Sequence, residues 1–272
     1  MSDVFLADAD FSSYRALIYN ESGIHFTATN RSILESRLKE HLRSKSVPDV
    51  KTYYNIISRD KEELKVFLDL ITTNLTRFFR NQAHFDALEH HVIPELLKIK
   101  KGSDNTTIRI WSAGCSTGEE PYTIAMLLTE ILPPPWKFEI TASDLSLKCL
   151  MTGKEGFYAD SRITGIPDAY LKKYFDKVEG GYKIHSNIMS TIRFDYHNLK
   201  NDSGLKNMDI VFCRNVIIYF DEAAQKAVIN RFWEAMSSKS FLFIGHSESL
   251  FGMDTKFEFL KTEWSTLYRK FI

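Results

Sequence analysis

The sequence predicts an α/β protein in which a small all-helical domain precedes a doubly wound α/β domain that carries a small antiparallel β insertion. Residues 10–72 show helical periodicity and no strand signal. Residues 108–131 read as strand, glycine turn and helix, the opening unit of a nucleotide-binding sheet. From about residue 155 to 195, glycines and short β-rich runs interrupt the β–α alternation. These three observations predict the fold class.

Length and composition narrow the class further. The 272 residues are 44% hydrophobic and 26% charged, as in ordinary globular proteins. Lysine plus arginine equals aspartate plus glutamate, 35 each, so no global charge favours nucleic acid or a membrane surface. The three cysteines are unclustered, which fits a reducing compartment and predicts neither disulfides nor a metal site. With no signal-peptide pattern and no apolar run near ~20 residues, we expect a cytoplasmic protein.

The N-terminal domain is predicted from three apolar faces at helical spacing. They are Phe11, Tyr14, Leu17 and Ile18; then Leu34, Leu38 and Leu42; then Leu64, Phe67, Leu68 and Ile71. Ser32 with Glu35, and Asp60 with Glu63, match the capping-box pattern of a helix start. β-Branched and capping residues interrupt the helical pattern at 72–76. We therefore expect a helical domain over residues 1–73 and a second domain over residues 74–272.

The second helix is basic on both flanks of its leucine stripe. Arg37, Lys39 and Arg43 are among these cations. They could form a solvated face with long side chains lying along apolar surface. They could equally dock an acidic partner helix. The residues alone leave both interpretations open.

The turn at Ser112–Gly118 departs from a dinucleotide fingerprint. Its glycines, Gly114 and Gly118, do not follow G-x-G-x-x-G, and Glu119 and Glu120 begin the helix. Two carboxylates at a helix N-terminus repel a pyrophosphate, but they tolerate a cationic nucleoside such as S-adenosylmethionine. Alternatively, the glutamates only complement the helix dipole.

The remaining elements of the second domain follow in order. A helix from about residue 82 is expected to break near Pro94, and a strand over 138–143 closes with Asp144. An acidic residue there either holds ribose hydroxyls or caps the next helix. Short strands at 182–185 and 191–194 are assigned to the insertion. A buried strand (209–213), a helix from Glu222, a second buried strand (240–245) and a hairpin (257–260 with 265–271) complete the domain.

Six blocks in the same order resemble the CheR-type chemotaxis receptor (methyl-accepting chemotaxis protein) glutamate O-methyltransferases. They are Thr73–Arg80 (TNLTRFFR), Trp111–Tyr122 (WSAGCSTGEEPY), Ala142–Asp144 (ASD), Asn198–Leu199, Phe212–Asp221 (FCRNVIIYFD) and Gly245–Glu248 (GHSE). The resemblance covers nearly the whole chain. It implies transfer of a methyl group from S-adenosylmethionine to receptor glutamates, giving glutamyl methyl esters and S-adenosylhomocysteine. It also implies an S-adenosylmethionine-dependent methyltransferase fold of the layout predicted above.

The resemblance also implies a set of site residues. The cofactor would be lined by Asn74, Thr76, Arg80, Glu119, Asp144, Asn198, Leu199, Asn215 and Val216, and the catalytic pair nearest the methyl group would be Arg80 and Tyr219. Arg80 would orient either the incoming carboxylate or that of the cofactor, and Tyr219 would lie beside the sulfonium. Read singly, most of these residues could be caps, turn residues or core. No metal is implied.

The family resemblance extends to the partner. The receptor-docking residues would be Arg37, Lys39 and Arg43, facing the cytoplasmic helical bundle of a chemoreceptor. Some family members also bind a receptor tail peptide through the β-subdomain, but the short turn at 176–181 resembles members that do not. We expect a monomer that binds neither nucleic acid nor the membrane.

Three rival functions remain at this stage. A Rossmann oxidoreductase lacks support because G-x-G-x-x-G is missing. A non-catalytic S-adenosylmethionine-binding scaffold in signalling would not need Arg80 or Tyr219, yet both are present. A more distant rival is a methyltransferase for nucleic acid or a small molecule, and the zero net charge disfavours the nucleic-acid version. No Ser-His-Asp, Cys-His or metal spacing stands out, which suits a carboxylate acceptor that is already ionised.

Overall fold

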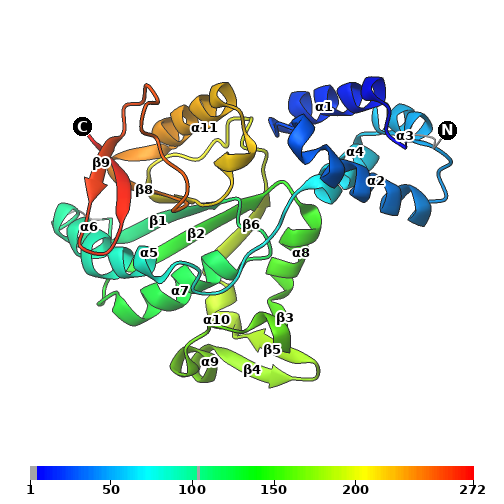
Figure 1. Cartoon of the computed structure of the whole chain (residues 1–272). Coiled ribbons are helices and arrows are strands. Elements are labelled where there is room, and N and C mark those ends of the chain that lie inside the picture. The colour runs from blue at the N-terminus through cyan, green and yellow to red at the C-terminus, as the bar shows by residue number, and fades with distance from the viewer. Residues whose placement is uncertain (1–4, 103–104) are drawn as a thin grey trace. The chain divides into compact units, whose positions relative to one another are not determined.

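The computed structural model describes residues 5–102 and 105–272, which form two compact units (Figure 1). One unit contains residues up to 73 together with 218–225. The other contains residues 74–217 and 226–272.

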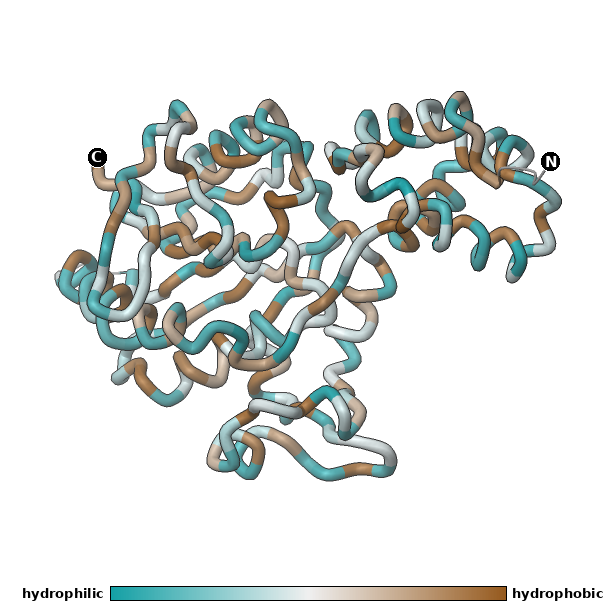
Figure 2. Tube along the Cα trace, in the orientation of Figure 1, coloured by the Kyte–Doolittle hydropathy of each residue, from teal (hydrophilic) through white to brown (hydrophobic). Residues whose placement is uncertain are grey.

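The first unit is built from four helices, as its apolar periodicity predicts. These are α1 (Asp8–Ser22), α2 (Arg31–Ser44), α3 (Val50–Ile57) and α4 (Lys61–Ile71), with a 3₁₀ turn, η1 (Ala28–Asn30), before α2. The leucine stripe of α2 is buried, and the ring of Phe67 on α4 contacts those of Tyr14 on α1 and Tyr53 on α3. Figure 2 shows hydrophobic and hydrophilic residues alternating along these helices.

One of the two predicted helix starts in this unit is confirmed. Asp60 caps α4, and its carboxylate accepts hydrogen bonds from the amides of Glu62 and Glu63 at 2.9 and 3.2 Å. The start predicted at Ser32 is wrong, because α2 begins at Arg31, directly after η1. Thr27 and Asn30 form the reciprocal cap one turn earlier.

The second unit contains a doubly wound sheet of seven strands. Its order is β6 (Ile192–Tyr196), β2 (Lys137–Asp144), β1 (Thr107–Ala113), β7 (Met208–Cys213), β8 (Met236–Ile244), β10 (Thr266–Phe271) and β9 (Glu258–Lys261). The first five strands are parallel, and the last two form the predicted antiparallel hairpin. The predicted fold class is confirmed.

Helices cover both faces of this sheet (Figure 1). On one face, Ile108 and Ile110 of β1 join a core cluster with the buried side of α7 (Glu119–Ile131). On the other face, the indole of Trp111 meets the ring of Phe232 on α11 (Glu222–Ala235), with centroids 5.2 Å apart. Successive residues of a strand point to opposite faces, so β1 is buried on both.

The helix expected to break near Pro94 continues through it. α5 (Gln82–Ala87) leads into a π turn, η2 (Leu88–Val92), and then α6 (Ile93–Ile99). In the π turn the amide of Ile93 donates to the carbonyl of Leu88. Proline has no N–H to lose at the next position, so the change of hydrogen-bond register is accommodated there.

The β insertion is present as a three-stranded antiparallel sheet in the order β3 (Phe157–Ala159), β5 (Gly181–Ile184), β4 (Phe175–Val178). It follows α8 (Leu147–Glu155), and it contains η3 (Asp160–Arg162), α9 (Asp168–Tyr174) and α10 (Ser186–Met189). The strand at 191–194 was assigned to the insertion wrongly. It begins β6, which pairs in parallel with β2 and buries Ile192 and Phe194.

The cysteines and the apolar character of the helices are the last two features of the fold. All three cysteines are buried with free thiols. Within residues 5–102 and 105–272, none of the helices has the length and apolar character needed to cross a bilayer.

Candidate active site

The strand order of the sheet reverses between β1 and β7, because the chain proceeds from β1 to β2 on one side and reaches β7 on the other. Ligands of doubly wound sheets bind outside the carboxyl ends of the strands at such a switch point. Glu119 follows β1, Asp144 ends β2, and Asn215 and Val216 follow β7. The topology therefore gathers four predicted cofactor residues at one edge.

Gly114 allows the loops after β1 and β7 to touch. Its φ is +83°, and a Cβ built there would lie 2.4 Å from Cγ2 of Val216. Real Cβ atoms do not approach so closely, and a positive φ disfavours other residues. The contact fixes the β1 loop against a predicted cofactor residue.

The backbone amides of the β1–α7 loop are used within the chain. The amides of Gly114 and Cys115 donate to the carbonyl of Ser143 at 2.8 and 2.9 Å. The amide of Ser116 donates to Oδ2 of Asp144 at 2.7 Å, and that of Gly118 donates to the carbonyl of Cys115. A phosphate-binding loop needs such N–H groups free for its ligand. These four amides are therefore not available to bind a phosphate.

Asp144 is a buried carboxylate that organises this loop. Its second oxygen accepts from the amide of Ser146 at 2.8 Å. Ser146 itself caps α8, accepting from the amide of Cys149, so the alternative that Asp144 caps that helix is wrong. Ribose binding by Asp144 stays a prediction.

The loop after β6 returns to the same edge of the sheet. The amide of His197 donates to the carbonyl of Asp144 at 3.0 Å. The next residue, Asn198, accepts from the amide of Lys200 through its side chain, and Leu199 is buried. The structure thus places both predicted residues of this loop near the end of β2.

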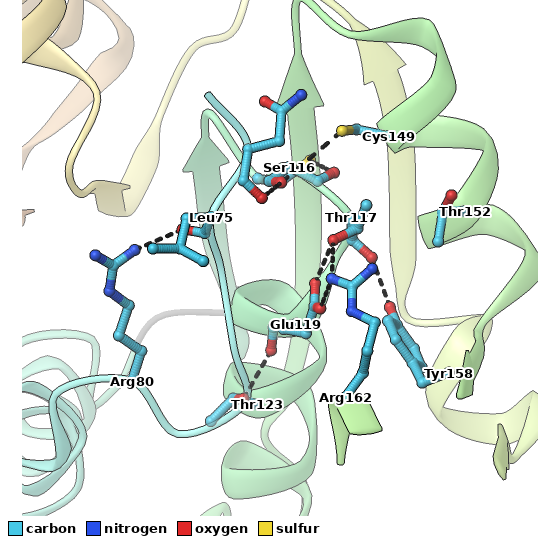
Figure 3. A network of polar contacts seen from close by, with 12 residues as sticks. Leu75, Arg80, Ser116, Thr117, Glu119, Thr123, Cys149, Thr152, Tyr158 and Arg162 are labelled. Atoms are coloured by element: carbon cyan, nitrogen blue, oxygen red, sulfur yellow. Dashed lines mark hydrogen bonds and ion pairs between the residues drawn. The ribbon is translucent and has the colours of Figure 1, made fainter. Parts of the chain in front are cut away.

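The segment of residues 74–80 runs along the β1–α7 loop. Oγ of Ser116 donates to the carbonyl of Asn74 at 3.1 Å, and the amide of Phe79 donates to Oγ1 of Thr123 at 3.2 Å. Nη1 of Arg80 donates to the carbonyl of Leu75 at 2.7 Å (Figure 3). Asn74, Arg80 and the half-buried Thr76 therefore lie on a segment that contacts the loop directly.

Glu119 is fully buried, and its carboxylate has partners within the chain (Figure 3). One oxygen pairs with Arg162 of η3 in the insertion, and the other accepts from Oγ1 of Thr117 at 2.7 Å. The guanidinium also donates to Oγ1 of Thr117, and the hydroxyl of Tyr158 donates to the carbonyl of Thr117. The insertion is thus tied to the start of α7.

Glu120 has a separate set of partners. Oγ of Ser112 donates to one oxygen at 2.7 Å, and Nη1 of Arg214 donates to the other at 3.3 Å. Burial raises the pKa of the Glu120 carboxyl, while the charge of Arg214 opposes the rise. The pair is a buried ion pair at the first turn of α7.

The ion pairs of Glu119 and Glu120 bear on which ligand can bind at the start of α7. The prediction that both glutamates act as unpaired charges toward the ligand is wrong, because each is paired with an arginine of the chain. A different observation disfavours a phosphate: the amides of Gly114, Cys115, Ser116 and Gly118 are already hydrogen-bonded within the chain. A cofactor contact of Glu119 stays a prediction.

Glu248 holds the loop after β7. Its carboxylate accepts hydrogen bonds from the amides of Asn215 at 2.9 Å, Val216 at 3.0 Å and Gly245. Asn215 has a φ of +59°, which costs energy for a residue other than glycine. The three bonds hold that conformation and so place both predicted cofactor residues of the loop.

Tyr219 lies in the helical unit, in the 3₁₀ turn η4 (Ile217–Tyr219) that follows β7. Its carbonyl accepts a hydrogen bond from the amide of His25 at 2.8 Å. Tyr219 follows Val216 by three residues in the chain, although it is assigned to the helical unit and Val216 to the other. Its position beside the methyl group stays a prediction.

The three predicted docking residues on α2 differ in their surroundings. Arg37 donates to the carbonyls of Leu70 and Thr72 at 3.2 and 2.8 Å, so it caps the end of α4. Lys39 forms an ion pair with Glu35 at 3.0 Å. Arg43 is exposed. Receptor docking by the three stays a prediction.

Sequence reasoning left three residues of this site without a role: Arg162, Arg214 and Glu248. Glu248 and Arg214 lie within the blocks that carry the family resemblance, so the blocks could have directed attention to them. Arg162 lies outside every block, and its partner Glu119 is 43 residues away in sequence. Only the fold reveals that pairing.

Two family models match the chain. The all-alpha domain of CheR methyltransferases matches residues 9–72, and the SAM binding domain of the same enzymes matches residues 74–266. The chain belongs to the CheR methyltransferase family. The CheR chain is therefore an S-adenosylmethionine-dependent methyltransferase, and the site described above is its candidate cofactor site.

Curated relatives agree with the family models. A chemotaxis protein methyltransferase of Borreliella burgdorferi is 37% identical, over 87% of this CheR chain and 86% of the relative. Chemotaxis protein methyltransferase 2 of Vibrio cholerae is 31% identical, over 99% and 96%. The chemotaxis protein methyltransferase of Escherichia coli is 33% identical, over 93% and 88%.

The residues of the site fit S-adenosylmethionine, a nucleoside that carries no phosphate. In the β1 loop at the switch point, four amides are hydrogen-bonded within the chain, and the end of β2 supplies a buried carboxylate. Among residues 5–102 and 105–272, no cluster of three or more metal-ligating side chains is found.

Replacing Glu248 tests whether it supports the cofactor site. In Glu248→Ala the amides of Asn215, Val216 and Gly245 lose their acceptor, so the strained loop should relax. We expect the affinity for S-adenosylmethionine, measured by calorimetry, to fall about tenfold. Glu258→Ala is the matched control, because Glu258 forms a half-exposed pair with Arg269 on the terminal hairpin. Equal affinities for Glu248→Ala and the control would contradict the role given to Glu248.

Proposed function

We propose that this enzyme methylates the side-chain carboxylates of glutamates in chemoreceptors, forming glutamyl methyl esters in chemotaxis adaptation. The observation that carries the proposal is the length of the match: relatives named chemotaxis protein methyltransferases align with 87–99% of the chain. S-Adenosylmethionine supplies an electrophilic methyl group, and the glutamate oxygen forms the new bond to its carbon as the bond to sulfur breaks.

Methyl transfer to a carboxylate requires the enzyme to align the two reactants, and it requires no proton transfer. A glutamate carboxylate is ionised at neutral pH, so the acceptor needs no general base. Effective alignment can lower a barrier by ~7–11 kcal/mol. A site that excludes water also favours a step in which an anion and a cation neutralise each other.

Arg80 and Tyr219 are the residues assigned to the transfer itself. Arg80 presents a half-buried guanidinium on a segment that contacts the β1–α7 loop through Asn74 and Phe79. We propose that it orients the glutamate carboxylate or that of the cofactor, and that Tyr219 presents its ring or its hydroxyl beside the sulfonium.

Substituting these two residues tests the assignment. We expect Arg80→Ala to lower kcat for methyl transfer about 100-fold and Tyr219→Phe to lower it severalfold, measured with labelled cofactor and receptor-containing membranes. The product should be a base-labile ester. Arg77→Ala is the control, because Arg77 is an exposed arginine of the same segment. Full activity in both variants would remove the assignment, and label in a base-stable product would remove the proposed function.

The receptor is proposed to meet the enzyme through α2 in the cytoplasm, at the helical bundle of the receptor. Arg43 is the clearest candidate because it is exposed, whereas Arg37 also caps α4. The enzyme is proposed to act as a monomer. Complementary charge would mainly speed and orient the encounter.

Reversing the charge of Arg43 tests this docking face. Arg43→Glu should raise KM for receptor membranes about fivefold at low salt and less at high salt, because salt screens exposed charges. The affinity for S-adenosylmethionine should stay unchanged. Arg15→Glu, an exposed arginine of α1, is the control. If both variants raise KM equally, net charge rather than this face is responsible.

The β insertion is proposed not to bind a receptor tail peptide. β4 and β5 are joined by a tight turn in which Gly180 has a positive φ, so few residues are available to grip an added strand. Calorimetric titration with a receptor tail peptide should give no measurable heat at micromolar concentrations. Saturable binding in that range would refute this part of the proposal.

A further inference from the structure

We propose that Arg214 is a positioning residue for methyl transfer, because its buried guanidinium holds the main chain of Arg80. The inference rests on the proposed function, in which Arg80 orients a carboxylate. Arg214 directly follows β7, and only 3% of its side chain is exposed.

The guanidinium of Arg214 joins two segments far apart in sequence. Nη2 donates to the main-chain carbonyl of Arg80, and Nη1 donates to Oε2 of Glu120 at 3.3 Å. Its central carbon lies 5.4 Å from the centroid of the Phe85 ring. The end of β7, the start of α7 and the segment carrying Arg80 therefore share one buried cation.

The backbone around Arg80 needs such support. Phe79 and Asn81, the residues on either side, have φ values of +51° and +64°. Left-handed conformations of non-glycine residues cost ~1–3 kcal/mol each and persist only where the surroundings hold them. The amide of Phe79 is held by Thr123, and the carbonyl of Asn81 accepts from the amide of His84. Arg214 supplies the hydrogen bond to Arg80 itself.

The surroundings of Arg214 keep its charge directed at these two partners. Glu120 is its buried counter-ion. Burial lowers the pKa of the neighbouring His84 to about 3, so that imidazole is neutral. Among the residues that the structure describes, Nε of Arg214 has no hydrogen-bond partner. A buried donor left unpaired costs ~1–3 kcal/mol, a cost that the two Nη contacts have to offset.

The consequence for catalysis is the placement of the Arg80 guanidinium. A misplacement of about 1 Å of an orienting group can cost about 100-fold in rate. A lysine at 214 keeps the positive charge, but its single ammonium cannot reproduce the planar fork that serves two acceptors at once. The planar guanidinium of Arg214, and not its charge alone, is therefore what positions Arg80.

A double-mutant cycle tests this assignment, because residues that act through one another are not additive. Arg214→Lys should lower kcat at least tenfold in the wild-type background and less than twofold in the Arg80→Ala background. The affinity for S-adenosylmethionine, measured by calorimetry, should change less than threefold in either. Lys100→Arg is the matched control, since Lys100 pairs with buried Asp209 at 2.7 Å near the start of β7. Its effect should be the same in both backgrounds.

The outcomes separate the inference from the function on which it rests. Equal losses for Arg214→Lys in both backgrounds would overturn the inference, even if Arg80→Ala is impaired. Wild-type activity of Arg80→Ala would instead remove the proposed role of Arg80. If Arg214→Lys does not fold, Glu120→Gln with Arg214→Met removes both buried charges together, and the same comparison in the two backgrounds decides.

Discussion

The backbone pairing of the β1–α7 loop with the end of β2 is the constraint on which the site depends. Ser143 and Asp144 accept the amides of three successive loop residues, and Gly114 brings the loop against Val216. Because those three amides already donate hydrogen bonds within the chain, they cannot bind an anion as the loop amides of dinucleotide folds do. The same arrangement leaves the carboxyl ends of β1, β2 and β7 rigidly spaced. A phosphate-free nucleoside is the ligand that such an edge can accept.

The two glutamates that begin α7 act as anchors for distant parts of the chain. Glu119 binds Arg162 of the insertion, and Glu120 binds Arg214 after β7. Each carboxylate has at least two donors, so neither is a buried charge without compensation. Buried, satisfied networks of this kind rigidify and specify a single arrangement. The first turn of α7 therefore links the insertion, the switch point and the segment that carries Arg80.

Much of the fold follows from periodicity, and the exceptions have physical causes. Alternation and helical spacing predict the strands and helices because each buries one pattern of side chains. They do not specify a strand's partner, so the run at 191–194 was placed in the insertion although β6 pairs with β2. Periodicity also does not decide between two capping residues about one turn apart, as the predicted Ser32 and the observed Thr27 show. The pairing of Glu119 with Arg162 depends on how the insertion folds back, which no local pattern encodes.

The titratable groups of the catalytic unit fit a reaction that transfers no proton. Burial raises the pKa of the thiols of Cys115 and Cys213 well above their usual range, and it lowers the pKa of His84 to about 3. At neutral pH the two thiols stay protonated and are poor nucleophiles, and the low pKa of His84 makes its neutral imidazole a weak base. An ionised acceptor needs neither a protein nucleophile nor a general base. The polar side chains of the site are committed to holding backbone, as Asp144, Arg214 and Glu248 show, and catalysis by such a site rests on geometry.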